Sequence, residues 1–204
     1  MWSLLLLVFV VLSHLLCAQA HGQWVDYPTD KNIGAETMSF VNARVGVVEG
    51  NLRGHPSVFA TSDSGKTWST WSYEPWDYEE NLLRKVALAK TGIGWVVGRA
   101  GVLRTDDFGV TWRSDSLALP DSLRTKKPLT DWTSVETANG WAFIAGCRDG
   151  RKVICRRSIL PDSVWHVVDL PGTLACEDQL YWMDVVGTMA PDGTGVVAIG
   201  ADTL

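Results

Sequence analysis

The sequence predicts an all-β protein, a β-propeller of four-stranded antiparallel blades, and two observations carry this expectation. The pattern [Ser/Thr]-x-Asp-x-Gly-x-Thr-Trp occurs at residues 61–68 and 105–112, with its tryptophans 44 residues apart, and a decayed copy at 158–165 keeps only Ser and Trp. A glycine also opens a short apolar run in four places, at Gly46, Gly94, Gly140 and Gly195. The spacings are 48, 46 and 55 residues, and one propeller blade takes roughly 40 to 50 residues. We therefore expect three blades and part of a fourth.

Each repeated unit predicts a short antiparallel meander. The glycine-led runs, rich in β-branched and aromatic residues, are buried strands at 46–50, 94–98, 140–146 and 195–200. A candidate strand precedes each of them, at 37–42, 83–89, 133–137 and 182–186. A further strand follows the first three, at 57–61, 101–105 and 152–156. No segment shows a convincing helical period, so we expect strands joined by turns and loops throughout.

The repeated eight-residue pattern has a mechanical explanation as a clamp on a hairpin. Each aspartate is expected to accept hydrogen bonds from turn amides, and each glycine to supply a positive φ. Each tryptophan then buries a large ring between strands. The residues to which we assign this structural role are Asp63, Gly65, Thr67, Trp68, Asp107, Gly109, Thr111 and Trp112. Trp112 and Trp141 are predicted to anchor the cores of the second and third blades.

The eight-residue pattern resembles the Asp-box (BNR) repeat of sialidases, some glycoside hydrolases and sortilin-type receptors. The longer stretch 94–112 is similar to photosystem II stability/assembly factor-like propellers, whose blades read Gly-Trp…Gly-x-x-Gly-x-Leu-x-Thr-x-Asp-x-Gly-x-Thr-Trp. The resemblance covers residues 38–112 well and 132–169 loosely. It implies the propeller fold, and it leaves the activity open because the box is a scaffold that many functions share.

The first 20 residues predict a secretory signal peptide, which leaves residues 21–204 as the propeller domain. An uncharged apolar run at 4–16 leads into Ala18-Gln19-Ala20, a small-x-small cleavage signal. Lipidation of Cys17 is the alternative, and Leu16 before it fits poorly. We therefore expect export to the periplasm, the cell surface or the medium, with no membrane span after cleavage. The net charge of −5 gives no reason to expect a nucleic-acid partner.

Three cysteines remain after cleavage, Cys147, Cys155 and Cys176. An odd number leaves at least one thiol free. Cys147 and Cys155 flank a predicted hairpin turn several residues out of register, beyond disulfide reach. A bridge from either to Cys176 stays open. The histidines and cysteines show no pair at metal-ligand spacing, so neither a metal nor another cofactor is expected.

Two segments offer candidate ligand-binding residues. The loop at 71–80 mixes aromatic and acidic side chains, which can stack on a sugar or hydrogen-bond to it, or else pack as a connector between blades; its candidates are Tyr73, Glu74, Trp76, Asp77 and Tyr78. A basic hairpin carries Arg148 and Arg151 as candidates, beside Lys152, Arg156 and Arg157. It can bind a carboxylate or phosphate, although a solvated hairpin is the simpler interpretation. Arg156 and Arg157 are adjacent, so they point to opposite faces of a strand.

These observations favour an exported, non-catalytic propeller that acts as a binding or assembly scaffold for a protein or a cell-surface glycan, with no catalytic residue assigned. The alternative is a fragment of a glycoside hydrolase, sialidase-like or a related Asp-box enzyme. A sialidase is expected to show an Arg-Ile-Pro element before its first box, and residues 21–60 contain only Arg44 and Arg53. The last unit carries no box, so we expect an open arc from a longer protein, prone to self-association through unpaired blade edges.

Overall fold

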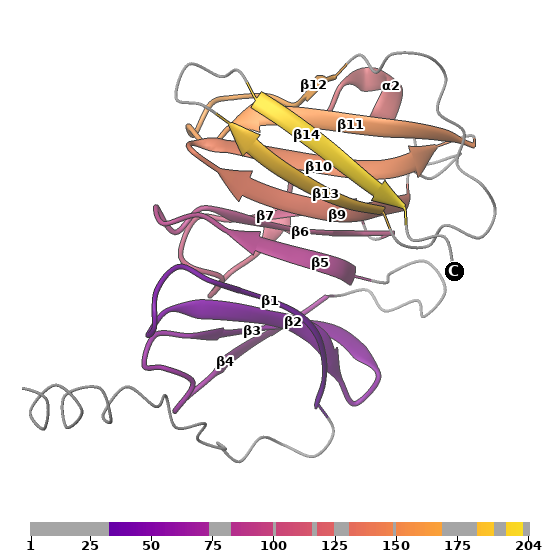
Figure 1. The fold of residues 1–204 in the computed structure, drawn as a ribbon. Helices are drawn as coiled ribbons and strands as arrows, with labels where there is room; N and C mark the ends of the chain where they lie inside the picture. Colours follow the sequence, from indigo (N-terminus) through magenta and orange to yellow (C-terminus); the bar gives the residue numbers. More distant parts are fainter. Residues whose placement is uncertain are drawn as a thin grey trace, which may run out of the picture.

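The structure, a computed structural model, describes residues 33–73, 83–99, 101–115, 118–124, 131–148, 150–168, 183–189 and 195–201. These residues form three four-stranded antiparallel sheets and one two-stranded sheet, which follow one another through the molecule (Figure 1). The all-β propeller class, with three blades and part of a fourth, is confirmed. The expected signal peptide at 1–20 lies outside the described residues.

Strand order within each sheet follows the chain, as a meander requires. Blade 1 contains β1 (Ile33–Phe40), β2 (Gly46–Leu52), β3 (His55–Thr61) and β4 (Ser69–Ser72). Blade 2 contains β5 (Leu83–Leu88), β6 (Gly94–Gly98), β7 (Gly101–Thr105) and β8 (Arg113–Ser114). Blade 3 contains β9 (Asp131–Ala138), β10 (Trp141–Arg148), β11 (Arg151–Ser158) and β12 (His166–Val167). The last sheet pairs β13 (Met183–Met189) with β14 (Gly195–Ala201).

The first strands of successive sheets lie against one another, β1 on β5, β5 on β9 and β9 on β13. The seam between blades 1 and 2 carries two side-chain hydrogen bonds. The amide of Val86 donates to Thr37 Oγ1 at 3.2 Å, and the amide of Leu88 donates to Ser39 Oγ at 2.9 Å. From the first hydrogen bond to the second, the residue number rises by two on each strand, so β1 and β5 run in the same direction.

This arrangement gives the molecule two opposite faces. One face carries the turns at 41–45, 89–93 and 139–140 together with the three motif turns at 61–68, 105–112 and 158–165. Backbone hydrogen bonds tie the two kinds of turn together in each blade, with the amides of Ser64, Phe108 and Ile159 donating to carbonyls at 2.9, 2.9 and 3.0 Å. We call this the motif face. The other carries the turns at 52–55, 98–101 and 148–151 and the first residues of β5 and β9, and we call it the arginine face.

The two larger apolar clusters lie between blades, and a smaller one of Phe143, Ala145 and Ile154 lies within blade 3. One cluster joins blades 1 and 2 and includes Val47, Val96 and Trp112. A second joins blades 2 and 3 around Trp95, Trp132 and Trp165. Trp112 is 7% exposed, which agrees with its predicted role in the core.

Four details differ from the sequence-based expectations. Trp141 is only half-buried, because the β10 side chains that follow it fill the interior. The buried tryptophans of blade 3 are Trp132 and Trp165 instead. Trp68 is also only half-buried, whereas its counterpart Trp112 is buried. A single helical turn, α2 at Asp121–Arg124, was not expected; its Leu123 packs into the core cluster of blades 2 and 3. Arg157, expected on a solvated hairpin, is buried.

The cysteines of blade 3 do not pair with each other. Cys147 is disulfide-bonded and Cys155 is a free, buried thiol. In the β10–β11 hairpin Cys155 pairs with Ile144 and Cys147 with Lys152, which confirms that the two cysteines are out of register. Burial raises the pKa of Cys155 to about 12, so this thiol is unreactive at neutral pH. Cys176 lies outside the described residues.

Candidate functional site

The two intact motif turns have the same hydrogen-bond network. In the first, Asp63 accepts from the Thr67 amide at 2.9 Å and from the Thr67 hydroxyl at 2.7 Å. The Thr61 hydroxyl donates to Asp63 at 3.0 Å and accepts from the Gly65 amide at 2.9 Å. The Trp68 indole closes the turn by donating to the Gly65 carbonyl at 2.9 Å. The carboxylate is thus held by its own turn.

The second turn repeats this network. Asp107 accepts from the Thr111 amide at 2.9 Å and the Thr111 hydroxyl at 2.6 Å, and the Trp112 indole donates to the Gly109 carbonyl at 2.9 Å. Gly65 and Gly109 have φ of 82° and 88°, which side chains resist. The residues before them, Ser64 at 67° and Phe108 at 60°, are also left-handed.

The electrostatics of both turns follow from these bonds. The amide and hydroxyl of Thr67 lower the pKa of Asp63 to about 2. For Asp107, burial alone would raise the pKa, and the hydrogen bonds from Thr111 outweigh it, so its pKa lies below the usual value. A general acid needs a pKa near the working pH, and both groups are shifted away from it. The network stabilises a turn and is not suited to proton transfer at neutral pH.

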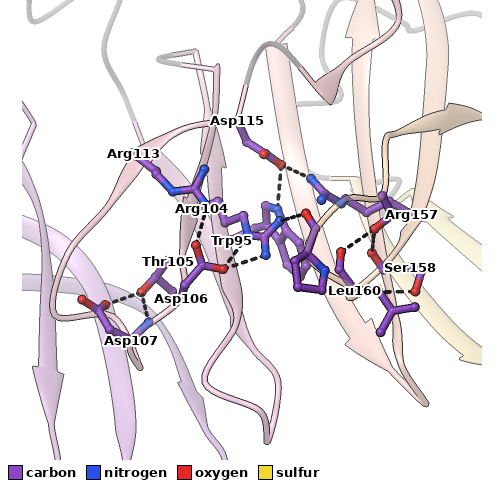
Figure 2. Close-up of polar contacts among 12 residues, drawn as sticks. Trp95, Arg104, Thr105, Asp106, Asp107, Arg113, Asp115, Arg157, Ser158 and Leu160 are labelled. Atoms are coloured by element: carbon purple, nitrogen blue, oxygen red, sulfur yellow. Dashed lines mark hydrogen bonds and ion pairs between the residues drawn. The ribbon is translucent and has the colours of Figure 1, made fainter.

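The decayed third motif has a different use for its tryptophan. Instead of a carbonyl of its own turn, Trp165 Nε1 donates to Asp115 Oδ2 at 2.9 Å, across the boundary between blades 3 and 2. The same oxygen accepts from Trp95 Nε1 at 2.9 Å and from Arg157 Nη1 at 2.6 Å (Figure 2). The rings of Trp95 and Trp165 meet edge to face with centroids 5.6 Å apart. We call Trp95, Asp115, Arg157 and Trp165 the blade 2–3 node.

A second arginine extends this node towards the surface. Arg104, 3% exposed, contacts the carboxylate of Asp106 at 2.6 Å and lies 5.7 Å from the Trp95 ring centroid. Asp106 also pairs with Arg113, whose side chain is 62% exposed (Figure 2). The Trp95 ring, which both Arg157 and Arg104 contact, therefore links the buried node to the ion pairs of Asp106 on the motif face.

Sequence reasoning missed this node because Arg157 and Trp165 lie 42 and 50 residues from Asp115 along the chain and on another blade. One signal was available for Arg157. Cys155 and Arg157 share one face of β11, because strand side chains alternate, and Cys155 is fully buried. An apolar residue two positions away predicts that Arg157 points inward.

Glu49 on β2 was also missed. It is 1% exposed and accepts a hydrogen bond from Thr37 Oγ1 at 3.3 Å. Burial raises the pKa of Glu49 to about 8, with a further contribution from nearby Glu36. Glu49 is therefore protonated at neutral pH, and it lies in the seam between blades 1 and 2.

The arginine face contains the cation cluster most suited to a ligand. Asp131, at the start of β9, accepts from Arg84 Nε and Nη2, both at 3.1 Å, and from Arg99 Nε at 3.3 Å. The Arg99 side chain is 36% exposed and that of Arg84 is 15% exposed. One carboxylate of blade 3 thus holds two guanidinium groups of blade 2 side by side.

Three of the candidates chosen from sequence are among the described residues, and they lie on this same face. Arg148 ends β10 and Arg151 begins β11, so both flank the blade 3 turn, half-buried and exposed respectively. Tyr73 lies in blade 1, where its amide donates to the Pro56 carbonyl at 3.1 Å and its ring meets Trp71 edge on at 6.1 Å. Blade 2 separates Tyr73 from the two arginines. The remaining four candidates lie outside the described residues: Glu74, Trp76, Asp77 and Tyr78.

The described part of the chain offers neither a metal cluster nor a membrane-spanning helix. No group of three or more His, Cys, Asp or Glu side chains there is placed to hold a metal ion. No helix within the described ranges is long and apolar enough to cross a membrane.

No family model and no curated protein matches the sequence. Among solved structures, the chain is similar to YCF48 bound to a D1 peptide, at 13% identity and a TM-score of 0.47, over 86% of this chain and 49% of that one. It is also similar to the GH74 enzyme of Niastella koreensis, at 9% identity and a TM-score of 0.35, over 66% of this chain and 30% of that one. The chain thus spans about half the length of the first structure. Both likenesses concern the fold, which the strand pairing establishes independently.

Proposed function

We propose that this chain is an exported, non-catalytic propeller that binds a carboxylate-bearing partner, a protein segment or an acidic cell-surface glycan, through its arginine face. The observation that carries this proposal is the pair of guanidinium groups, Arg84 and Arg99, assembled on Asp131. Arginine forks match carboxylates in planar, two-bond geometry. The side chain of Arg99 is 36% exposed, so a ligand can reach it from the solvent.

Turns on the same face extend the cationic surface. Arg53 in the blade 1 turn and Arg151 in the blade 3 turn are both exposed. This concentration contrasts with the net charge of −5 on the whole chain. A local positive potential on an acidic protein favours anionic partners and raises their association rate.

The proposal is tested by screening the full chain against a random linear peptide library displayed on phage, an array of neutral and acidic glycans, and chromogenic glycosides. The arginine-face variant is a triple variant in which Arg99, Arg148 and Arg151 are all changed to Gln. The matched control is a triple variant in which Arg44, Lys66 and Arg113 are all changed to Gln. We expect carboxylate-rich peptides or acidic glycans to be recovered. Their affinity should fall at least tenfold in the arginine-face variant and stay unchanged in the control.

Two results would overturn the proposal. One is recovery of neutral ligands whose binding ignores the arginine-face substitutions. The other is hydrolysis of a glycoside that Asp107→Asn abolishes at unchanged thermal stability, which would favour the glycoside hydrolase alternative.

A further inference from the structure

A groove of about 410 Å³ crosses the motif face, opposite the arginine face. Its walls come from three blades, with Phe40 and Val41 from blade 1, Leu88 and Ala89 from blade 2, and Trp141 from blade 3. The groove lies where the inner strands end, at the meeting point of the β1–β2, β5–β6 and β9–β10 turns.

Exposed apolar side chains gather on this face. Phe40 in the groove wall is 45% exposed, and Leu160, next to a wall residue, is 67% exposed. Phe108 and Val110 in the second motif turn are 39% and 52% exposed. Exposed apolar side chains that gather on one face mark an interaction site more often than exposed residues scattered singly do.

Phe108 shows that the apolar surface is not a by-product of the turn. It has a φ of 60°, where a bulky side chain is unfavourable, and its ring lies over Gly92 beside the groove. The equivalent position in the first motif turn is Ser64, also left-handed at 67°. The motif turn therefore folds with a small polar residue at this position. The fold of the turn does not explain why the second copy has an aromatic side chain there. Strained residues of this kind concentrate at ligand-binding sites.

The charges around the groove select the occupant. Lys90 is exposed and is the one charged side chain among the described wall residues. Arg156 is exposed and its guanidinium lies over the Trp141 ring, 5.5 Å from the centroid. None of the described wall residues is acidic. An occupant with apolar side chains next to a carboxylate complements both features.

We infer that this groove binds a linear peptide segment of a protein partner in which aromatic or aliphatic residues adjoin Asp or Glu. A peptide fits better than a sugar, because the described wall offers mainly apolar side chains, with Thr91, Thr137 and Asn139 as its uncharged polar side chains. Sugar recognition depends on many hydrogen bonds. The groove is on the face opposite the arginine cluster, so the chain presents two separate binding surfaces.

The test uses two groove variants of the full chain. Phe108→Ser introduces the residue that the first motif turn already tolerates, so the turn should fold. Lys90→Glu reverses the charge of the groove. The matched controls are Lys66→Glu, which makes the same charge change on the same face outside the groove, and Val164→Ser, which removes an exposed apolar side chain outside it. Circular dichroism and thermal melts establish that each variant is folded.

The probe is a random linear peptide library displayed on phage, selected on the full chain, followed by titration of a synthetic, fluorescein-labelled peptide of the recovered consensus. We expect a consensus that combines an aromatic or aliphatic residue with Asp or Glu. Its affinity should fall at least tenfold in Phe108→Ser and in Lys90→Glu, and less than twofold in both controls.

Three outcomes would overturn the inference. The first is no enrichment over the unselected library. The second is a consensus peptide combining apolar and acidic residues that binds Phe108→Ser and Lys90→Glu as tightly as it binds the unmodified chain. The third is a glycan-array ligand whose binding Phe108→Ser abolishes, which would make the groove a sugar site.

Discussion

Substitution of Asp115 tests how strongly the blade 2–3 node holds the molecule together. Asp115 is 6% exposed, and one of its oxygens accepts from Arg157, Trp95 and Trp165. Asp115→Ala leaves Arg157, 1% exposed, without its carboxylate, and Arg157 Nε already has no hydrogen-bond partner among the described residues. Removing one partner of a buried ion pair costs about 3 to 5 kcal/mol. The two indole donors left unpaired raise the cost towards the upper end of that range.

A double-mutant cycle separates the unpaired charge from the lost contacts. Arg157→Met removes the charge and keeps a long apolar side chain, so adding it to Asp115→Ala eliminates the buried cation. We expect the double variant to be more stable than Asp115→Ala alone, with a coupling energy of about 0.5 to 3 kcal/mol, the usual range for residues in contact. Arg113→Ala is the surface control, because its pair with Asp106 is exposed and contributes about 0 to 1 kcal/mol.

The assay is urea denaturation of the full chain, followed by far-ultraviolet circular dichroism and by tryptophan fluorescence. Exposed ion pairs contribute about 0 to 1 kcal/mol. If Asp115→Ala lowered the free energy of unfolding by no more than the loss of an exposed ion pair does, the node would not hold blades 2 and 3 together. A double variant whose losses simply add would contradict the argument as well.

Three further predictions concern the turns and the seam between blades 1 and 2. Trp112→Ala should cost about 3 to 5 kcal/mol in urea denaturation, and Trp68→Ala clearly less, because Trp68 is only half-buried; equal losses would contradict this. Gly109→Ala should be more destabilising than Gly65→Ala, since an added Cβ would lie 2.3 Å from a buried valine at the first site and 3.3 Å from the turn's own tryptophan at the second. Thermal melts that rank the two in reverse would count against it. Glu49, whose pKa rises from 4.5 to about 8 on folding, stabilises the fold fully below its unfolded pKa and loses that contribution as the pH rises through about 8. Glu49→Gln should therefore have the same free energy of unfolding as the unmodified chain near pH 4.5, and a higher one near pH 8, by at most about 4 to 5 kcal/mol. If the free energies of unfolding of the two proteins changed in parallel with pH, this prediction would be wrong.

Sequence periodicity located the blades because the signals that define them are local. The glycine-led runs begin at the observed starts of β2, β6 and β14 and one residue before β10, and the predicted strand at 101–105 coincides with β7. Turn chemistry explains this agreement: an Asp, a Gly and a Trp within eight residues specify a hairpin without help from the rest of the chain.

The interactions between blades could not be predicted in the same way. The contacts of Asp115 with Arg157 and Trp165 join blade 2 to blade 3, and no local pattern encodes which side chains meet across that boundary. The exposure of Trp141 has a similar origin. It has the same place in its blade as the fully buried Trp95, but it lies in the wall of the motif-face groove.

The sequence indicated only some of the arginines that lie on the arginine face. Arg148 and Arg151 were chosen from a local cluster of charge, and they do lie on the arginine face. Arg84 and Arg99 were not chosen, because each is an isolated arginine in the sequence and only the fold brings them together on Asp131.

Carboxylate binding by the arginine face can be measured by isothermal titration calorimetry. A recovered carboxylate-rich ligand is titrated into the full chain and into the variant with Arg99, Arg148 and Arg151 all changed to Gln. We expect at least a tenfold loss of affinity in that variant, and none when Arg44, Lys66 and Arg113 are changed to Gln. Equal affinity of the unmodified chain and the arginine-face variant would contradict carboxylate binding at this face.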